Sequence, residues 1–256
     1  MPDLTTTLGP FTLRSFTFFL GLALAATVAV ALLRLRPVAA AGRVVDALLG
    51  ALLGAVAGAR LAHVALNWDY FATHTSEIVR LSAGGLDWHG ALAGGLLGLA
   101  LVARWRRLSA AQVLDALTPA LPLLALGGWY ACWAAACGYG REVDTLANYP
   151  AYAVAELPDV FGLVAPRYST QVFGLWLALA LLGVAVLLVG TNRLAGLRFW
   201  LVLALLGGGM FAIGFLRGDP AVIAGGLRLD QWLDALIVLA GVAGMIAARR
   251  QRAAVG

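Results

Sequence analysis

The sequence predicts an all-α membrane protein that crosses the bilayer about seven times, with its N-terminus outside and its C-terminus in the cytoplasm. Three observations lead to this class: 62% of the 256 residues are hydrophobic, only 12% are charged, and long apolar runs recur along the chain. Soluble globular proteins carry roughly 45–50% apolar and about 25% charged residues. The chain therefore lacks the polar surface that a water-soluble fold needs.

Seven apolar segments are long enough to cross the hydrocarbon core, for which an α-helix needs about 20 residues. They lie near residues 12–33, 44–67, 88–104, 112–136, 171–190, 197–216 and 231–248. The run that begins at Phe11 continues for a full span without a clean cleavage site, which predicts a membrane helix rather than a signal peptide. Residues 1–256 are expected to form a single polytopic membrane domain.

The orientation follows from the arginines, which supply all 18 basic residues of the chain. Eleven of them fall in alternate connections, which are cytoplasmic by the positive-inside rule: Arg34, Arg36, Arg43, Arg104, Arg106, Arg107, Arg193, Arg198, Arg249, Arg250 and Arg252. The arginines are scattered between apolar runs and form no basic face, so nucleic acid is not expected as a partner. Anionic phospholipid is the predicted partner.

Several polar residues fall near the predicted outer ends of the helices. An ionisable group inside hydrocarbon costs about 2.5–3.5 kcal/mol on insertion scales, so each such group needs a reason. Arg60, deep in the second segment, is predicted to need a buried partner or a bound anion. The others could also be ordinary interfacial or snorkelling residues. The full set is Arg14, Arg60, His63, Asn67, His89, Gln171, Arg217 and Gln231.

Two cysteines and two sets of glycines carry simpler expectations. Cys132 and Cys137 stand five residues apart in an apolar run. On one continuous helix they would point to different faces, so no internal disulfide is expected. The glycines recur at G-x-x-x-G spacing and predict close helix packing in lipid; they are Gly54, Gly58, Gly90, Gly94 and Gly98.

Eight stretches along nearly the whole chain carry a family resemblance. They are Leu8–Arg14, Gly58–Leu61, Gly84–Gly95, Thr118–Pro122, Gly140–Arg141, Tyr168–Gln171, Phe215–Asp219 and Asp230–Gln231. In this order they resemble the motifs of bacterial prolipoprotein diacylglyceryl transferases. The stretch around His89 is similar to that family's His-Gly-Gly-Leu-x-Gly segment. The resemblance implies seven helices in the bacterial inner (cytoplasmic) membrane, with the N-terminus outside.

The same resemblance implies a reaction and a set of site residues. The family transfers a diacylglyceryl group from phosphatidylglycerol to a cysteine thiol of a prolipoprotein, which forms a thioether and releases glycerol phosphate. This chemistry needs a base for the thiol and cations for the phosphate. His89 is the candidate base and Arg217 the candidate catalytic cation. The expected substrate-binding residues are Arg60, Arg141, Gln171, Arg14 and Gln231. No cofactor and no metal are expected.

The chain departs from the family pattern along the predicted fourth helix. The family's arginine there is Trp129, its two asparagines are Cys132 and Ala135, and its glutamate is Cys137. These losses keep two alternatives open. One is a non-catalytic relative that binds anionic phospholipid or a membrane partner. The other is a transporter, which no internal repeat or pair of broken helices supports.

Overall fold

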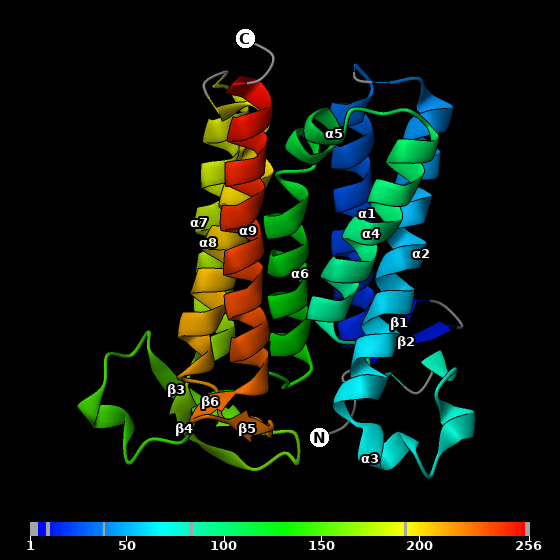
Figure 1. The fold of residues 1–256 in the computed structure, drawn as a ribbon. Helices are drawn as coiled ribbons and strands as arrows, with labels where there is room; N and C mark the ends of the chain where they lie inside the picture. The colour runs from blue at the N-terminus through cyan, green and yellow to red at the C-terminus, as the bar shows by residue number, and fades with distance from the viewer. Residues whose placement is uncertain (1–4, 9–10, 38, 82–83, 192–193, 254–256) are drawn as a thin grey trace. The chain divides into compact units, whose positions relative to one another are not determined.

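A computed structural model describes residues 5–8, 11–37, 39–81, 84–191 and 194–253 of a mostly helical chain (Figure 1). A helix occupies each of the seven predicted segments. These helices are α1 (Ser15–Leu35), α2 (Ala41–Leu66), α4 (Trp88–Trp105), α5 (Ala110–Ala116) with α6 (Ala120–Ala134), α7 (Thr170–Val189), α8 (Arg198–Gly214) and α9 (Leu229–Ala253). Gly9, Pro10 and Arg193, which entered the predictions above, lie outside the described residues.

Within the described ranges, four helices are long and apolar enough to cross a membrane: α1, α2, α7 and the Leu229–Gln251 part of α9. The pair α5 and α6 counts as a fifth if it forms one broken span, since its two helices are bent by 43°. The chain is therefore a mostly helical, multi-pass membrane protein, which is consistent with the predicted all-α class, and the number of seven crossings stays a prediction.

The apolar segment predicted over residues 112–136 is not one continuous helix. The helix breaks at 117–119, and α6 starts after Pro119. Proline has no backbone N–H and disfavours the helical conformation of the residue before it, here Thr118.

The chain divides into two compact units, Leu32–Val113 and the remainder, which consists of Met1–Ala31 with Leu114–Gly256. In the first, α2 and α4 run antiparallel and pack on each other, and the connection between them holds α3 (Trp68–Phe71) and the 3₁₀ turn η1 (Thr75–Glu77). The contact is made by six glycines, called here the glycine seam: Gly50, Gly54, Gly58, Gly90, Gly94 and Gly98. A methyl group added at Gly54 would overlap the carbonyl of Gly94. The predicted glycine packing is thereby confirmed.

The second unit packs α6, α7, α8 and α9 beside one another, with α1 against α6 through Ala23 and Gly127. Its strands form three antiparallel hairpins: β1 (Thr5–Leu8) with β2 (Phe11–Arg14), β3 (Val154–Pro158) with β4 (Val164–Tyr168), and β5 (Ile223–Ala224) with β6 (Leu227–Arg228). A 3₁₀ turn, η3 (Leu146–Asn148), precedes β3. Because β4 leads into α7 and β6 into α9, these hairpins set the positions of the first residues of both helices.

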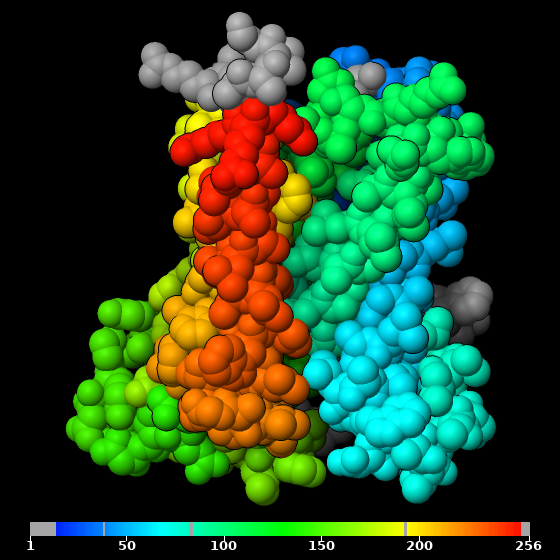
Figure 2. All heavy atoms as spheres, viewed as in Figure 1, coloured from blue at the N-terminus to red at the C-terminus, as the bar shows by residue number. Residues whose placement is uncertain are grey.

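The outer surfaces of the helices are apolar. α9 forms an unbroken strip on the face drawn in Figure 2, and its exposed side chains include Leu236, Leu239 and Ile246. On α7, Leu187 is 74% exposed. Large continuous apolar surfaces are rare on soluble monomers, so these faces fit contact with lipid.

Candidate functional site

Asp87 and His89 form an acid–imidazole pair at the start of α4. Asp87 is the N-cap of this helix, because its Oδ1 accepts a hydrogen bond from the Gly90 N–H at 2.8 Å. Its Oδ2 lies 3.3 Å from Nδ1 of His89, and the imidazole is 8% exposed. The backbone N–H of Asp87 donates to the Ala59 carbonyl at 3.1 Å, which fixes the pair against α2.

The environment of Asp87 keeps its carboxylate ionised. Burial raises the pKa of Asp87, but the hydrogen bonds from His89 and from the Gly90 N–H outweigh it and lower the pKa below its usual value. A carboxylate beside Nδ1 favours the tautomer with the proton on Nδ1. The role of His89 as a general base stays a prediction.

Arg60 lies in the same unit, and its guanidinium binds backbone carbonyls. Nε donates to Ile78 at 2.8 Å, Nη2 to Glu77 at 2.5 Å, and Nη1 to Gly84 at 2.7 Å and to Gly85 at 2.9 Å. Four of the five guanidinium N–H donors are therefore used within the described residues. The buried partner that the sequence predicted for Arg60 is the connection between α2 and α4.

Arg217 belongs to the second unit and follows the end of α8. Its Nε donates to Oδ1 of Asp219 at 2.8 Å and its Nη2 to Oδ2 of the same carboxylate, while Nη1 lies 3.0 Å from Asp230. Burial lowers the pKa of Arg217, but the hydrogen bonds and the charge of Asp219, with the charge of Asp230, outweigh it and raise the pKa. The guanidinium is therefore a permanent, partly buried cation.

Arg228 and Gln231 complete this cluster. Arg228 lies 3.4 Å from the Asp219 carboxylate and donates to Asp230 at 3.0 Å. Gln231 is 2% exposed; its Oε1 accepts from the Arg228 N–H at 3.0 Å and its Nε2 donates to the Phe211 carbonyl at 3.1 Å. Two arginines thus alternate with two aspartates at the junction of α8 and α9.

Arg141 is joined to the Arg217 segment through the backbone. Gly140 and Arg217 form an isolated β-bridge, and the Arg141 N–H donates to the Leu216 carbonyl at 2.8 Å. The side chain of Arg141 is exposed and has no polar partner among the residues that the structure describes. The guanidinium N–H donors of Arg141 are therefore unused among the described residues, whereas four of the five donors of Arg60 bind backbone carbonyls.

A disulfide lies at the end of α6, where none was predicted, and Gln171 binds to it through the backbone. Cys132 and Cys137 form a disulfide, with their Cα atoms 4.6 Å apart. The expectation of no internal disulfide is wrong because α6 ends at Ala134, so Cys137 lies on a turn that folds back and not on the helix. Gln171, at the start of α7, is 3% exposed and donates to the Cys137 carbonyl at 3.1 Å.

Arg14 ends β2, where its backbone pairs with Thr5, and the next residue starts α1. Its side chain is exposed. The predicted site residues thus divide between the two units. One unit contains Arg14, Arg141, Gln171, Arg217 and Gln231, and the other contains Arg60 and His89. The expected action of Arg60, Arg141 and Arg217 on one phospholipid stays a prediction.

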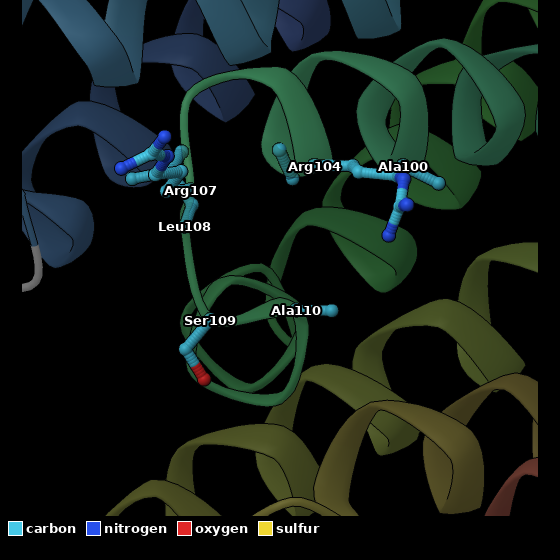
Figure 3. Close-up of a pocket in the computed structure, with 7 residues that line it drawn as sticks. Ala100, Arg104, Arg107, Leu108, Ser109 and Ala110 are labelled. Carbon is cyan, nitrogen blue, oxygen red and sulfur yellow. The ribbon is translucent and has the colours of Figure 1, made fainter.

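A groove of about 580 Å³ lies at the C-terminal end of α4, opposite to the end that carries His89 (Figure 3). It is lined by Ala100, Ala103, Arg104, Arg107, Leu108, Ser109 and Ala110. In Figure 3 the side chains of Arg104 and Arg107 point to opposite sides, so they do not form a two-arginine clamp. None of the predicted site residues lines this groove.

The order of these groups along the chain matches one family of known proteins. The sequence model of the prolipoprotein diacylglyceryl transferase family matches residues 3–247. This chain belongs to the prolipoprotein diacylglyceryl transferase family. The resemblance predicted from the motifs is confirmed.

Named relatives of this transferase family match most of the chain. The phosphatidylglycerol–prolipoprotein diacylglyceryl transferase of Streptococcus mutans is 29% identical over 214 residues, which cover 82% of this chain and 80% of the relative. A second enzyme of this name, from Clostridium perfringens, is 27% identical over 193 residues, 74% of this chain and 73% of the relative. That of Lactococcus lactis is 26% identical over 203 residues, 78% and 76% of the two chains.

The sequence analysis did not propose any aspartate as a site residue. Asp87, Asp219 and Asp230 each contact a predicted site residue. A signal was available, since each stands one or two residues from His89, Arg217 or Gln231. An acid at that distance from a buried cation or imidazole is a natural partner for it.

Proposed function

We propose that this chain transfers a diacylglyceryl group from phosphatidylglycerol to the cysteine thiol of a prolipoprotein. The observation that carries the proposal is the family match over residues 3–247, which includes every predicted site residue. The relatives' names state the lipid donor and the protein acceptor. The chemistry of the described side chains supports the same reaction.

The reaction first needs a thiolate, because the thiolate and not the thiol is the nucleophile. We assign the base to His89, whose Nε2 takes the thiol proton while Asp87 holds the ring through Nδ1. The sulfur then forms a bond to the glycerol carbon of the diacylglyceryl group, and the bond from that carbon to the phosphate oxygen breaks. The bonding electron pair leaves with the phosphate, which later takes up the proton from His89.

The departing glycerol phosphate needs a cation. We assign this role to Arg217, since a guanidinium binds phosphate oxygens in bidentate fashion. Its present partner, the Asp219 carboxylate, likewise presents two oxygens to the Nε and Nη2 donors of the guanidinium. The lipid headgroup is proposed to be bound by Arg14, Arg60, Arg141, Gln171 and Gln231. Arg60 contributes by holding the connection between α2 and α4 in shape.

The proposal includes a location and a topology. We place the chain in the bacterial cytoplasmic membrane, as one domain of residues 1–256 with seven crossings, an external N-terminus and a cytoplasmic C-terminus. The apolar helices and the arginine-rich alternate connections support this orientation. Fusions of a periplasm-active reporter after Tyr149 and after Arg250 test it: activity is expected at the first position only, and the reverse would overturn the orientation.

The reaction is tested with purified protein, phosphatidylglycerol and a peptide that carries the acceptor cysteine. Thioether product is expected from the wild type. A loss of about 10²–10³-fold is expected for His89→Ala and for Arg217→Lys, because each removes a group that acts in the transition state. Arg80→Lys is the matched control, since Arg80 is 63% exposed and pairs only with Glu77 among the described residues.

The outcomes separate the transferase from a relative that only binds lipid. Lipid binding without thioether product would reject the transferase and favour the binding protein. Turnover that is unaffected in both variants would keep the reaction and reject the two assigned roles.

A further inference from the structure

The C-terminus of α6 ends in a turn that is closed by the disulfide. The Cys137 N–H donates to the Cys132 carbonyl at 2.9 Å, and the Ala136 N–H donates to the Trp133 carbonyl at 3.5 Å. This is the hydrogen-bond pattern of a Schellman motif, in which the two outer residues are usually joined by an apolar contact. Here those residues are Cys132 and Cys137, and a covalent bond replaces the apolar contact.

The backbone of this turn is unfavourable without the bond. Ala136 occupies the left-handed position of the motif with φ 56°. Glycine is usual there, because a Cβ atom clashes with the following carbonyl in the left-handed conformation. The disulfide therefore holds closed a turn that its own sequence disfavours.

The closed turn presents two carbonyls to the first residues of α7. Thr170 Oγ1 donates to the Gly138 carbonyl at 2.6 Å, and Gln171 Nε2 donates to the Cys137 carbonyl at 3.1 Å. The Oε1 of Gln171 is buried and accepts no hydrogen bond from the residues that the structure describes. The turn thus fixes the Gln171 amide, whose buried acceptor oxygen is left without a partner among the described residues.

The residues after the turn lead directly to the Arg217 segment. The Gly218 N–H donates to the Tyr139 carbonyl at 2.8 Å, and the bridge between Gly140 and Arg217 follows. Arg141 comes next, with its exposed guanidinium. The position of the turn is therefore transmitted through backbone hydrogen bonds to both arginines.

We propose that the Cys132–Cys137 disulfide is a positioning element for the lipid headgroup, which holds Gln171, Arg141 and the Arg217 segment in their binding arrangement. The inference rests on the proposed function, because the headgroup is that of the lipid donor. The cysteines contact no substrate and act through the turn. In this chain the two disulfide cysteines, Cys132 and Cys137, stand at the positions that hold an asparagine and a glutamate in the family pattern.

The test compares three variants at a temperature far below unfolding. Cys132→Ser with Cys137→Ser removes the bond and is expected to raise the KM for phosphatidylglycerol by about tenfold, because small displacements of binding groups are costly. The value of kcat is expected to change less than twofold. Adding Ala136→Gly to this pair relieves the left-handed residue and is expected to restore most of the KM. Ala135→Ser, on the same turn, is the control.

A binding measurement keeps the inference separate from the proposed function. Thermal stabilisation by phosphatidylglycerol over phosphatidylcholine, in detergent micelles, is expected for the wild type and reduced for the double serine variant. If the wild type binds in this way without turnover and the double serine variant binds less, the transferase proposal fails and the positioning role stands. If both proteins bind and turn over equally, the positioning role is rejected. Free Cys132 and Cys137 thiols in protein from intact membranes would also overturn it.

Discussion

The Oδ2 atom of Asp87 lies 3.3 Å from Nδ1 of His89, while Oδ1 of the same carboxylate caps α4 through the Gly90 N–H. One side chain therefore both starts the helix and orients the imidazole. The helix start and the direction of the ring are fixed together, so His89 cannot turn away without losing the partner of its Nδ1. Capping and orientation can nevertheless be separated by substitution, because they use different oxygens.

The change Asp87→Asn is expected to lower kcat by about 10²-fold, close to the loss for His89→Ala, since general-base catalysis contributes about 10²–10⁴. Asparagine still caps the helix well. Its NH₂ group, however, would face Nδ1 and favour the tautomer with the proton on Nε2, which cannot accept the thiol proton. The measurement is thioether formation at saturating lipid, with the unfolding temperature recorded in parallel.

Asp87→Ala serves as the comparison, because it removes the cap as well as the charge. It is expected to lose activity equally and stability more, by about 1 kcal/mol. Wild-type kcat in the asparagine variant would rule out the orienting role.

The stability of the fold is expected to depend on Asp87 at acidic pH. The pKa of Asp87 is lowered in the folded state from its reference value of 3.8. A lowered pKa means that the ionised form stabilises the fold at pH values above the unfolded-state pKa, and that this contribution disappears as the pH falls through the lower, folded-state pKa. The unfolding temperature of the wild type should therefore exceed that of Asp87→Asn at neutral pH, and the difference should shrink below about pH 4. A difference that stays constant down to about pH 3 would contradict the stabilising role of the ionised Asp87 carboxylate.

Arg60→Lys is expected to loosen the connection between α2 and α4. A lysine ammonium is a compact charge with three donors and cannot span the four carbonyls that the guanidinium reaches. The loss of charge-assisted hydrogen bonds should reduce the unfolding free energy by roughly 2–4 kcal/mol. Hydrogen exchange at the amides of residues 77–81 should rise, whereas Arg80→Lys should leave it unchanged. Unchanged exchange with a raised KM would indicate that Arg60 contacts the lipid directly.

Much of the helical fold could be predicted because lipid imposes simple rules on sequence. Apolar runs located the helices, and the glycine spacing predicted the contact between α2 and α4. The break before α6 was missed although Pro119 marks it, because the apolar run continues across it. The disulfide was missed for a related reason. A spacing of five residues excludes a disulfide on a continuous helix but permits one across a Schellman turn. The left-handed position of this turn holds Ala136 and not glycine, so the sequence did not indicate that the helix ends there.

The candidate site was only partly predictable. The sequence proposed His89 and Arg217 as site residues but not the carboxylates that contact them, because partner choice depends on the folded backbone and not on spacing alone. Arg60 illustrates the converse. Its need for a buried partner followed from its depth in the membrane, while the identity of that partner, four loop carbonyls, required the structure.

Gly54→Ala and Gly94→Ala are each expected to destabilise the α2–α4 pair. A methyl group at either position overlaps a backbone carbonyl of the other helix, which cannot move as a side chain can. The two helices must separate, at about 1–3 kcal/mol per substitution. Gly42→Ala in α2 is the matched control: nothing lies within 4 Å of the added methyl, so the higher helix propensity of alanine should be neutral or stabilising.

The double variant tests whether the seam acts as one contact. After the first substitution has separated the helices, the second methyl meets open space, so the combined loss should be smaller than the sum of the two. The separation should also lengthen the hydrogen bond from the Asp87 N–H to the Ala59 carbonyl, because Gly58 and Gly90 flank it. Gly58→Ala should therefore lower transferase activity more than Gly50→Ala at the far end of the seam. Strictly additive losses, with equal activity at both ends, would show that the six glycines are independent and do not position His89.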